Sequence, residues 1–79
     1  MIIGCTRERK NHEYRVGLTP SNALAYIQAG HTVLMERDAG TNSGFQDAEY
    51  SAQGAEILQT AEEVCGRCEM LVKIGRAHV

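Results

Sequence analysis

Long apolar runs and an even set of cysteines are both missing from this sequence. No stretch of its 79 residues approaches the roughly 18 continuous apolar residues of a membrane span. The apolar start "MIIGC" lacks a basic segment and is too short for a signal peptide. The three cysteines, an odd number, argue against a disulfide framework. We therefore expect reduced thiols and a cytoplasmic location.

An excess of charge of one sign is also missing. Eight Lys and Arg stand against ten Asp and Glu, for a formal net charge of −2. This balance gives no electrostatic reason to expect nucleic acid or an anionic membrane as a partner. The run "RERK" holds three cations, but Glu8 and Glu13 lie in and beside it, so we interpret it as a solvated loop.

The motifs of phosphate binding and of hydrolytic triads are absent as well. A dinucleotide-binding turn carries G-x-G-x-x-G, whereas "GCTRERK" has one glycine, so we expect no cofactor-binding residue in this segment. "GTNSG" at 40–44 is not followed by Gly-Lys-Ser/Thr, and we interpret it as a turn. No Ser/His/Asp arrangement is visible.

A single C-x-x-C, Cys65-Gly-Arg-Cys68, raises the possibility of redox or metal chemistry. A redox pair needs its first thiol near a helix N-terminus, but these cysteines fall at an expected helix end. The histidines His12, His31 and His78 do not supply two more zinc ligands at a suitable spacing. We expect ordinary thiols, a structural His31 and no metal site.

Strand-like and helix-like segments alternate along the chain. Thr19-Pro20 is a helix-start signal, and Gly30 is suited to end that helix. Asp47 can cap a short helix to about residue 52, and Thr60 with Glu63 forms a capping box for the next. Short strands are expected at 1–5, 31–36, 55–58 and, as the last strand, 70–73.

This alternation predicts an α/β fold, a Rossmann-like or flavodoxin-like parallel sheet with flanking helices. Ligands of such sheets bind outside the carboxyl ends of the strands. Arg15 lies in the loop that leaves the first strand, and its planar fork matches a carboxylate. The residues alone leave open a plainer alternative, in which Arg15 forms a surface ion pair with Glu13.

With Arg15 placed, a family resemblance becomes visible. "MIIGCTRERKNHEYRVGLTP" resembles the N-terminus of alanine dehydrogenases, whose pattern runs close to M-x-I-G-x-x-K-E-x-K-x-x-E-x-R-V-x-L-T-P. "AGHTVLMERDAGTNSGFQDAEY" and "GAEILQTAEEV" continue it in register, so the resemblance covers residues 1–73. One departure is Arg7-Glu8-Arg9, where the family usually has Lys-Glu-Ile or similar.

The resemblance implies an NAD-dependent oxidoreductase that interconverts L-alanine and pyruvate plus ammonia. It assigns Arg15 to the substrate carboxylate and residues 1–73 to the first, incomplete part of a discontinuous substrate domain. In the family the catalytic His and Asp and the NAD site lie further along the chain, so we expect this chain alone to be inactive. The family forms homo-oligomers, commonly hexamers.

Two alternatives remain. The alpha subunit of proton-translocating NAD(P) transhydrogenase shares the R-V-x-x-T-P turn, but Tyr14 and "SGF" at 43–45 are more like alanine dehydrogenase. A small flavodoxin-like binding or receiver module would need an Asp pair after the first strand. Thr6-Arg7 stands there instead.

The tail "IGRAHV", residues 74–79, departs from the resemblance. The family continues as K-V-K-E-P; Lys73 matches the first lysine, but Gly75 replaces the second, which contacts substrate in the family. The tail back-translates as ATC-GGA-AGA-GCA-CAC-GTC, which is similar to a common sequencing adapter. We expect a non-native tail from adapter read-through. Sequencing the source gene across codon 73 would test this.

Overall fold

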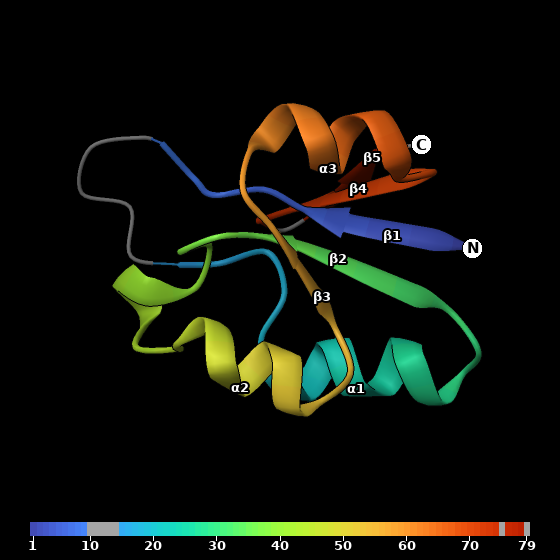
Figure 1. The fold of residues 1–79 in the computed structure, drawn as a ribbon, viewed down its shortest axis with the longest axis horizontal. Coiled ribbons are helices and arrows are strands. Elements are labelled where there is room, and N and C mark those ends of the chain that lie inside the picture. Colours follow the sequence, from blue (N-terminus) through green and yellow to red (C-terminus); the bar gives the residue numbers. More distant parts are fainter. Residues whose placement is uncertain (10–14, 75, 79) are drawn as a thin grey trace.

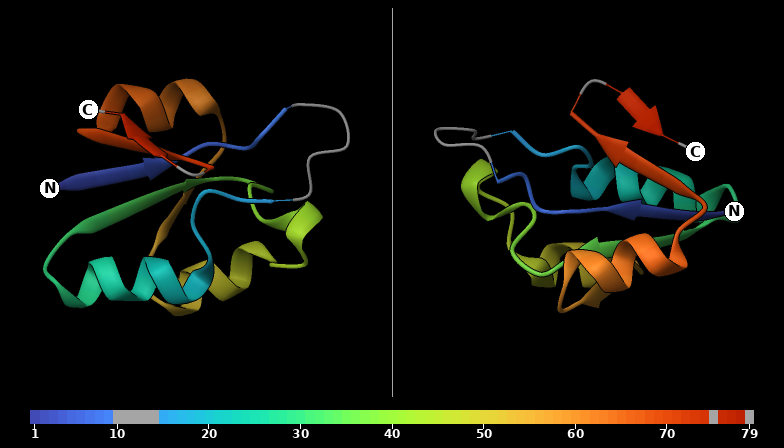
Figure 2. Two further views of the ribbon diagram at one scale, coloured as in Figure 1. Left: turned by 180° about the vertical axis from the view of Figure 1, so that it is seen from behind. Right: turned by 90° about the horizontal axis from the view of Figure 1, so that it is seen from above.

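The computed structural model describes residues 1–9 and 15–74, together with the backbone of residues 76–78. Three helices flank a sheet whose strand order is β3-β2-β1-β4-β5 (Figure 1). The strands are β1 (Ile2–Cys5), β2 (Thr32–Glu36), β3 (Glu56–Leu58), β4 (Met70–Lys73) and β5 (Arg76–His78). The helices are α1 (Pro20–Gln28), α2 (Asp47–Ala52) and α3 (Ala61–Arg67). A short 3-10 helix, η1, spans Thr41–Ser43. The helices α1 and α2 cover one face of the sheet, and α3 covers the other (Figure 2).

The first four strands confirm the predicted parallel α/β fold. β1 is central and pairs in parallel with both β2 and β4, and β3 pairs in parallel with β2. The expectation that 70–73 is the last strand was wrong, because β5 follows and pairs antiparallel to β4, with Lys73 opposite Arg76. A three-residue strand has no apolar alternation to reveal it and depends on the free edge of β4. The boundary expected at residue 73 stays a prediction.

The predicted helix starts were confirmed at two of three helices. Thr19 accepts a hydrogen bond from the Asn22 amide at 3.2 Å, and Thr60 accepts one from the Glu63 amide at 3.1 Å. The assignment of Asp47 as a cap was wrong, since Gln46 precedes the helix and donates its amide to Glu49 at 2.7 Å. The carboxylate of Asp47 instead accepts the amide of Asp38 at 3.0 Å.

The core lies in two layers because strand side chains alternate between the faces of the sheet. On the α1 and α2 face, the strand residues Ile3, Cys5, Val33 and Met35 pack with Tyr50. On the α3 face, three residues form a smaller cluster: Leu34, Leu58 and Val64.

Glycine at position 4 lets α3 approach β1. A Cβ built on Gly4 would stand 2.7 Å from a methyl of Val64 and 2.8 Å from the Cβ of Cys68. Such distances are too short for real carbon atoms, so α3 can lie on the centre of the sheet only because no side chain projects there. Within the described residues, no helix is long and apolar enough to span a membrane.

Candidate functional site

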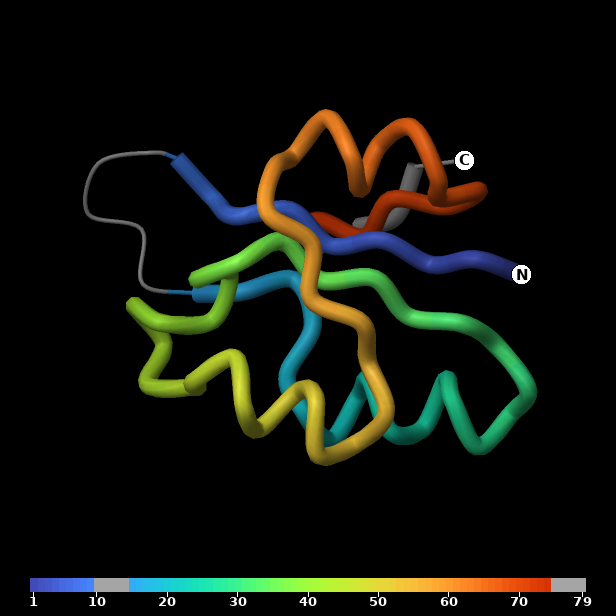
Figure 3. Tube along the Cα trace, viewed as in Figure 1, coloured from blue at the N-terminus to red at the C-terminus, as the bar shows by residue number. Residues whose placement is uncertain are grey.

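The carboxyl ends of β1 and β4 enclose a small crevice with the loop that follows β1. In Figure 3 the described start of this loop, after β1, and its described end, before α1, lie at the same edge of the sheet. The crevice has a volume of about 220 Å³, and its lining comes from both ends of the loop and the end of β4: Thr6, Arg7, Glu8, Arg9, Gly17, Val72, Lys73 and Ile74. Three of the lining residues are cationic, Arg7, Arg9 and Lys73, and one, Glu8, is anionic.

Gly17 brings the returning loop against β4. A Cβ at this position would lie 2.9 Å from the carbonyl oxygen of Val72 and 3.3 Å from the Cα of Lys73. Because these contacts are with backbone atoms, which cannot move aside as a flexible side chain can, glycine is required for the loop to close on the strand.

Glu36 holds the outgoing end of the loop. One oxygen of its carboxylate accepts the backbone amide of Arg7 at 2.7 Å and a guanidinium nitrogen of Arg9 at 3.1 Å. The other oxygen accepts the second guanidinium nitrogen of Arg9 at 2.5 Å. The pair is therefore bidentate, the strongest geometry between an arginine and a carboxylate.

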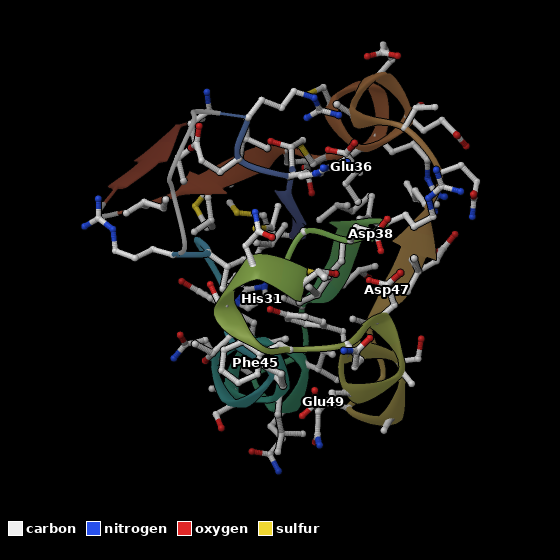
Figure 4. All side chains as sticks on the ribbon, turned by 90° about the vertical axis from the view of Figure 1, so that its left-hand side faces the viewer. His31, Glu36, Asp38, Phe45, Asp47 and Glu49 are labelled. Atoms are coloured by element: carbon white, nitrogen blue, oxygen red, sulfur yellow. The ribbon has the colours of Figure 1, made fainter. Side chains whose placement is uncertain are left out.

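Burial and the two arginines act on Glu36 in opposite directions. Desolvation alone would raise its pKa, but the hydrogen bonds from Arg9 and the Arg7 amide, with the charges of both arginines, outweigh it. The pKa of Glu36 is therefore lowered from its ordinary value, and the carboxylate is ionised at neutral pH. Figure 4 looks onto this edge of the molecule and shows Glu36 on the α3 side of the sheet.

Tyr50 holds the incoming end of the loop. Its hydroxyl donates a hydrogen bond to the carbonyl oxygen of Leu18 at 2.7 Å, and both residues are buried. The loop is thus tied to β2 at its start and to α2 at its end.

Arg15, the predicted carboxylate-binding residue, is exposed and lies two positions before Gly17. It belongs to the returning part of the loop, but it is not one of the described residues that line the crevice. Glu13, the partner in the alternative ion pair, lies outside the described residues, so that alternative stays open.

The other residues singled out in the sequence lie away from the crevice. Cys65 is exposed in α3 and Cys68 directly follows that helix, as expected. His31 lies before β2, where its Nδ1 is 3.3 Å from the N-terminal amine. Among residues 1–9 and 15–74, no group of three His, Cys, Asp or Glu is placed to hold a metal ion.

The residues that the structure describes do not fit a dinucleotide cofactor. In the β1–α1 connection, the glycine that is present, Gly17, packs on β4 and is not part of a phosphate-binding turn. The space beside Gly4 is likewise filled, by Val64 of α3 and by Cys68, so this glycine cannot receive a phosphate either. No chemical step can therefore be assigned to NAD from this segment.

Glu36 and its bond to Arg9 were not predicted from the sequence. An acid at the carboxyl end of an otherwise apolar strand, at the same sheet edge as an arginine-rich loop, is the signal that could have found the pair. To use that signal, one must already know the order of the strands, because Glu36 reaches the loop only if β2 lies beside β1.

The fold is an α/β unit built on parallel strands, and its crevice lies at the carboxyl edge of the sheet, where ligands of such folds bind. Comparison with known proteins gives the particular family. The family described as "Alanine dehydrogenase/PNT, N-terminal domain" matches residues 4–78, and the chain belongs to that family.

Alanine dehydrogenases from several organisms are similar to this chain. The enzyme of Methanococcus maripaludis is 49% identical over 74 residues, and alanine dehydrogenase 2 of Staphylococcus aureus is 46% identical over the same length. Each alignment covers 94% of this chain but 20% of the relative. The chain therefore spans about one fifth of the length of the curated relatives it matches.

Solved structures show the same similarity. An L-alanine dehydrogenase superposes with a TM-score of 0.88 at 45% identity, over 92% of this chain and 20% of the other. A transhydrogenase from Sinorhizobium meliloti superposes with a TM-score of 0.84 at 25% identity, with the same coverage. The fold is shared by both, whereas the sequence is more similar to the alanine dehydrogenase.

Proposed function

We propose that residues 1–73 are the N-terminal part of the substrate domain of an NAD-dependent L-alanine dehydrogenase. That enzyme interconverts L-alanine and pyruvate plus ammonia, with NAD as the hydride carrier. The observation that carries the proposal is the crevice at the carboxyl edge of the sheet, bordered by the loop that bears Arg15. The similarity to alanine dehydrogenases along nearly the whole chain supports it.

In this proposal Arg15 binds the substrate carboxylate. Its guanidinium presents two parallel N–H donors to the two carboxylate oxygens, which fixes both the position and the plane of the substrate. NAD, the catalytic residues and the contacts of a homo-oligomer, commonly a hexamer, belong to the remainder of the enzyme. The three free cysteines fit the reducing environment of the cytoplasm.

A hybrid enzyme tests the proposal. Residues 1–73 replace the equivalent segment of the Methanococcus maripaludis alanine dehydrogenase, and Arg15→Lys is then introduced. Lysine keeps the charge but loses the planar fork, so we expect KM for pyruvate to rise roughly tenfold or more, with KM for NADH unchanged.

The matched control is Arg67→Lys, which changes the same residue type at an exposed ion pair with Glu56 on the α3 surface. It should leave both constants unchanged. Unaltered kinetics in Arg15→Lys, or an inactive hybrid, would contradict the proposal.

A further inference from the structure

Among the residues whose side chains the structure describes, Glu36 is the one charged residue that is buried. Its residue is 4% exposed, at the carboxyl end of β2. A buried carboxylate costs free energy unless it is paired and hydrogen-bonded. The partners that offset this cost therefore show what the residue holds in place.

Among the described residues, the hydrogen bonds of the Glu36 side chain all go to the loop that forms the crevice. The carboxylate accepts the amide of Arg7 and both terminal nitrogens of Arg9, and these two residues line the crevice. The charge of Glu62, in the first turn of α3, acts on Arg9 in the same sense as Glu36. The crevice wall formed by residues 7–9 is therefore held in position by groups that lie behind it.

Two contacts hold the described parts of the connection between β1 and α1. The connection between β1 and α1 runs from Thr6 to Thr19, but Glu36 fixes it at Arg9, and the approach of Gly17 to β4 fixes it again. Arg15 lies between these two points. Parts of the loop that are already ordered have less backbone entropy to lose when a ligand binds.

We propose that Glu36 is a positioning residue for substrate binding, acting through the Arg7 amide and the Arg9 guanidinium to hold the wall of the crevice. This inference rests on the proposed function, in which Arg15 binds the carboxylate. It also gives a role to Arg9, because an aliphatic residue at that position could not form the bidentate bond. Glu36 does not touch the substrate, so its effect is on affinity and not on the chemical step.

The test uses the same hybrid enzyme. Glu36→Gln removes the charge but retains an acceptor for the Arg7 amide. We expect a roughly fivefold to tenfold rise in KM for pyruvate, with kcat within about twofold and KM for NADH unchanged. Arg9→Gln should give the same pattern, and the double variant should be no worse than either single one, because both changes break one contact. Glu36→Asp, which keeps the charge, should recover part of the affinity.

Glu56→Gln is the matched control, since Glu56 also makes a bidentate bond to an arginine but lies on the exposed surface. It should not change KM. If Glu36→Gln lowers only the unfolding temperature, or lowers kcat with KM unchanged, the positioning role is wrong. If Arg15→Lys is also neutral, the proposed function itself fails, so the two failures are distinguishable.

A second measurement uses the 79-residue chain directly. Amide hydrogen exchange of Arg7 should be at least tenfold faster in Glu36→Ala, while the central strand residue Ile3 exchanges as before. Equal exchange at Arg7 in the two proteins would overturn the role of Glu36 in holding the loop.

Discussion

The hydroxyl of Tyr50 in α2 donates a hydrogen bond of 2.7 Å to the carbonyl oxygen of Leu18, 32 residues earlier in the sequence. Gly40 makes room for this bond, because a Cβ there would stand 2.5 Å from the Tyr50 oxygen. Burial raises the pKa of Tyr50 above its ordinary value, so the hydroxyl remains protonated and able to donate. The bond joins the returning end of the crevice loop to a helix on the α1 and α2 face.

Removing that hydroxyl should destabilise the chain. Tyr50→Phe leaves the ring in place but leaves the buried carbonyl of Leu18 without its donor, so we expect a loss of about 1–3 kcal/mol in the free energy of unfolding. Urea denaturation measures it. Tyr26→Phe, at a half-buried ring on α1, is the control and should change little. A loss as small as that of the control would contradict the importance of the bond.

Two glycines should respond in opposite directions to alanine. Gly4→Ala places a methyl group against Val64 and Cys68, and overpacking of this kind costs about 1–3 kcal/mol. Gly66→Ala meets nothing within 4 Å and lies within α3, so it should stabilise by up to about 1 kcal/mol. Thermal unfolding of both variants measures the difference. Equal effects would mean that α3 does not lie close to β1.

Acid should remove the contribution of Glu36. Because its pKa is lower in the folded chain than its ordinary value of 4.5, its stabilising effect is complete above that value. The effect is lost as the pH falls through the folded pKa. Glu36→Gln should therefore be less stable than the parent at pH 7 but should lose less stability on acidification to about pH 3.

Glu56→Gln is again the control for this pH series. Its pair with Arg67 is half exposed on both sides, and solvent screens such pairs. If Glu56→Gln and Glu36→Gln lower the free energy of unfolding equally at pH 7, burial does not strengthen the contribution of Glu36.

The three thiols should react in a fixed order. Cys65 is exposed, whereas burial raises the pKa of the Cys5 thiol to about 11. Burial, with the neighbouring Cys65, also raises the pKa of Cys68. A disulfide reagent at about pH 8 should therefore modify Cys65 first, Cys68 more slowly and Cys5 only on unfolding, as followed by mass spectrometry. Early modification of Cys5 would contradict its burial in the native chain.

Local signals made most of the fold predictable. Thr19-Pro20 and Gly30 mark the ends of α1 by their own backbone preferences, and the apolar run before Glu36 marks β2. The assignment of Asp47 as a cap failed by one residue, because Gln46 takes that position while Asp47 accepts the amide of Asp38. Such a contact across a turn has no signature in a single segment.

The position of the crevice in the fold could be predicted from the sequence, but the contacts that hold its wall could not. The rule that ligands bind at the carboxyl ends of parallel strands locates the loop of Arg15. The bond between Arg9 and Glu36 joins residues 27 positions apart, and it exists because β2 lies next to β1. Neither fact follows from residue spacing, and the role of Arg15 stays a prediction.

The central position of β1 has a consequence for synthesis on the ribosome. β1 ends at Cys5, but its second neighbour, β4, begins at Met70. At about 5–20 residues per second, roughly 3–13 s separate the two. During that interval one edge of the innermost strand has no partner within its own chain, and an unpaired edge is where nascent chains associate. The central strand of the sheet therefore gains its second partner only after β4 has been translated.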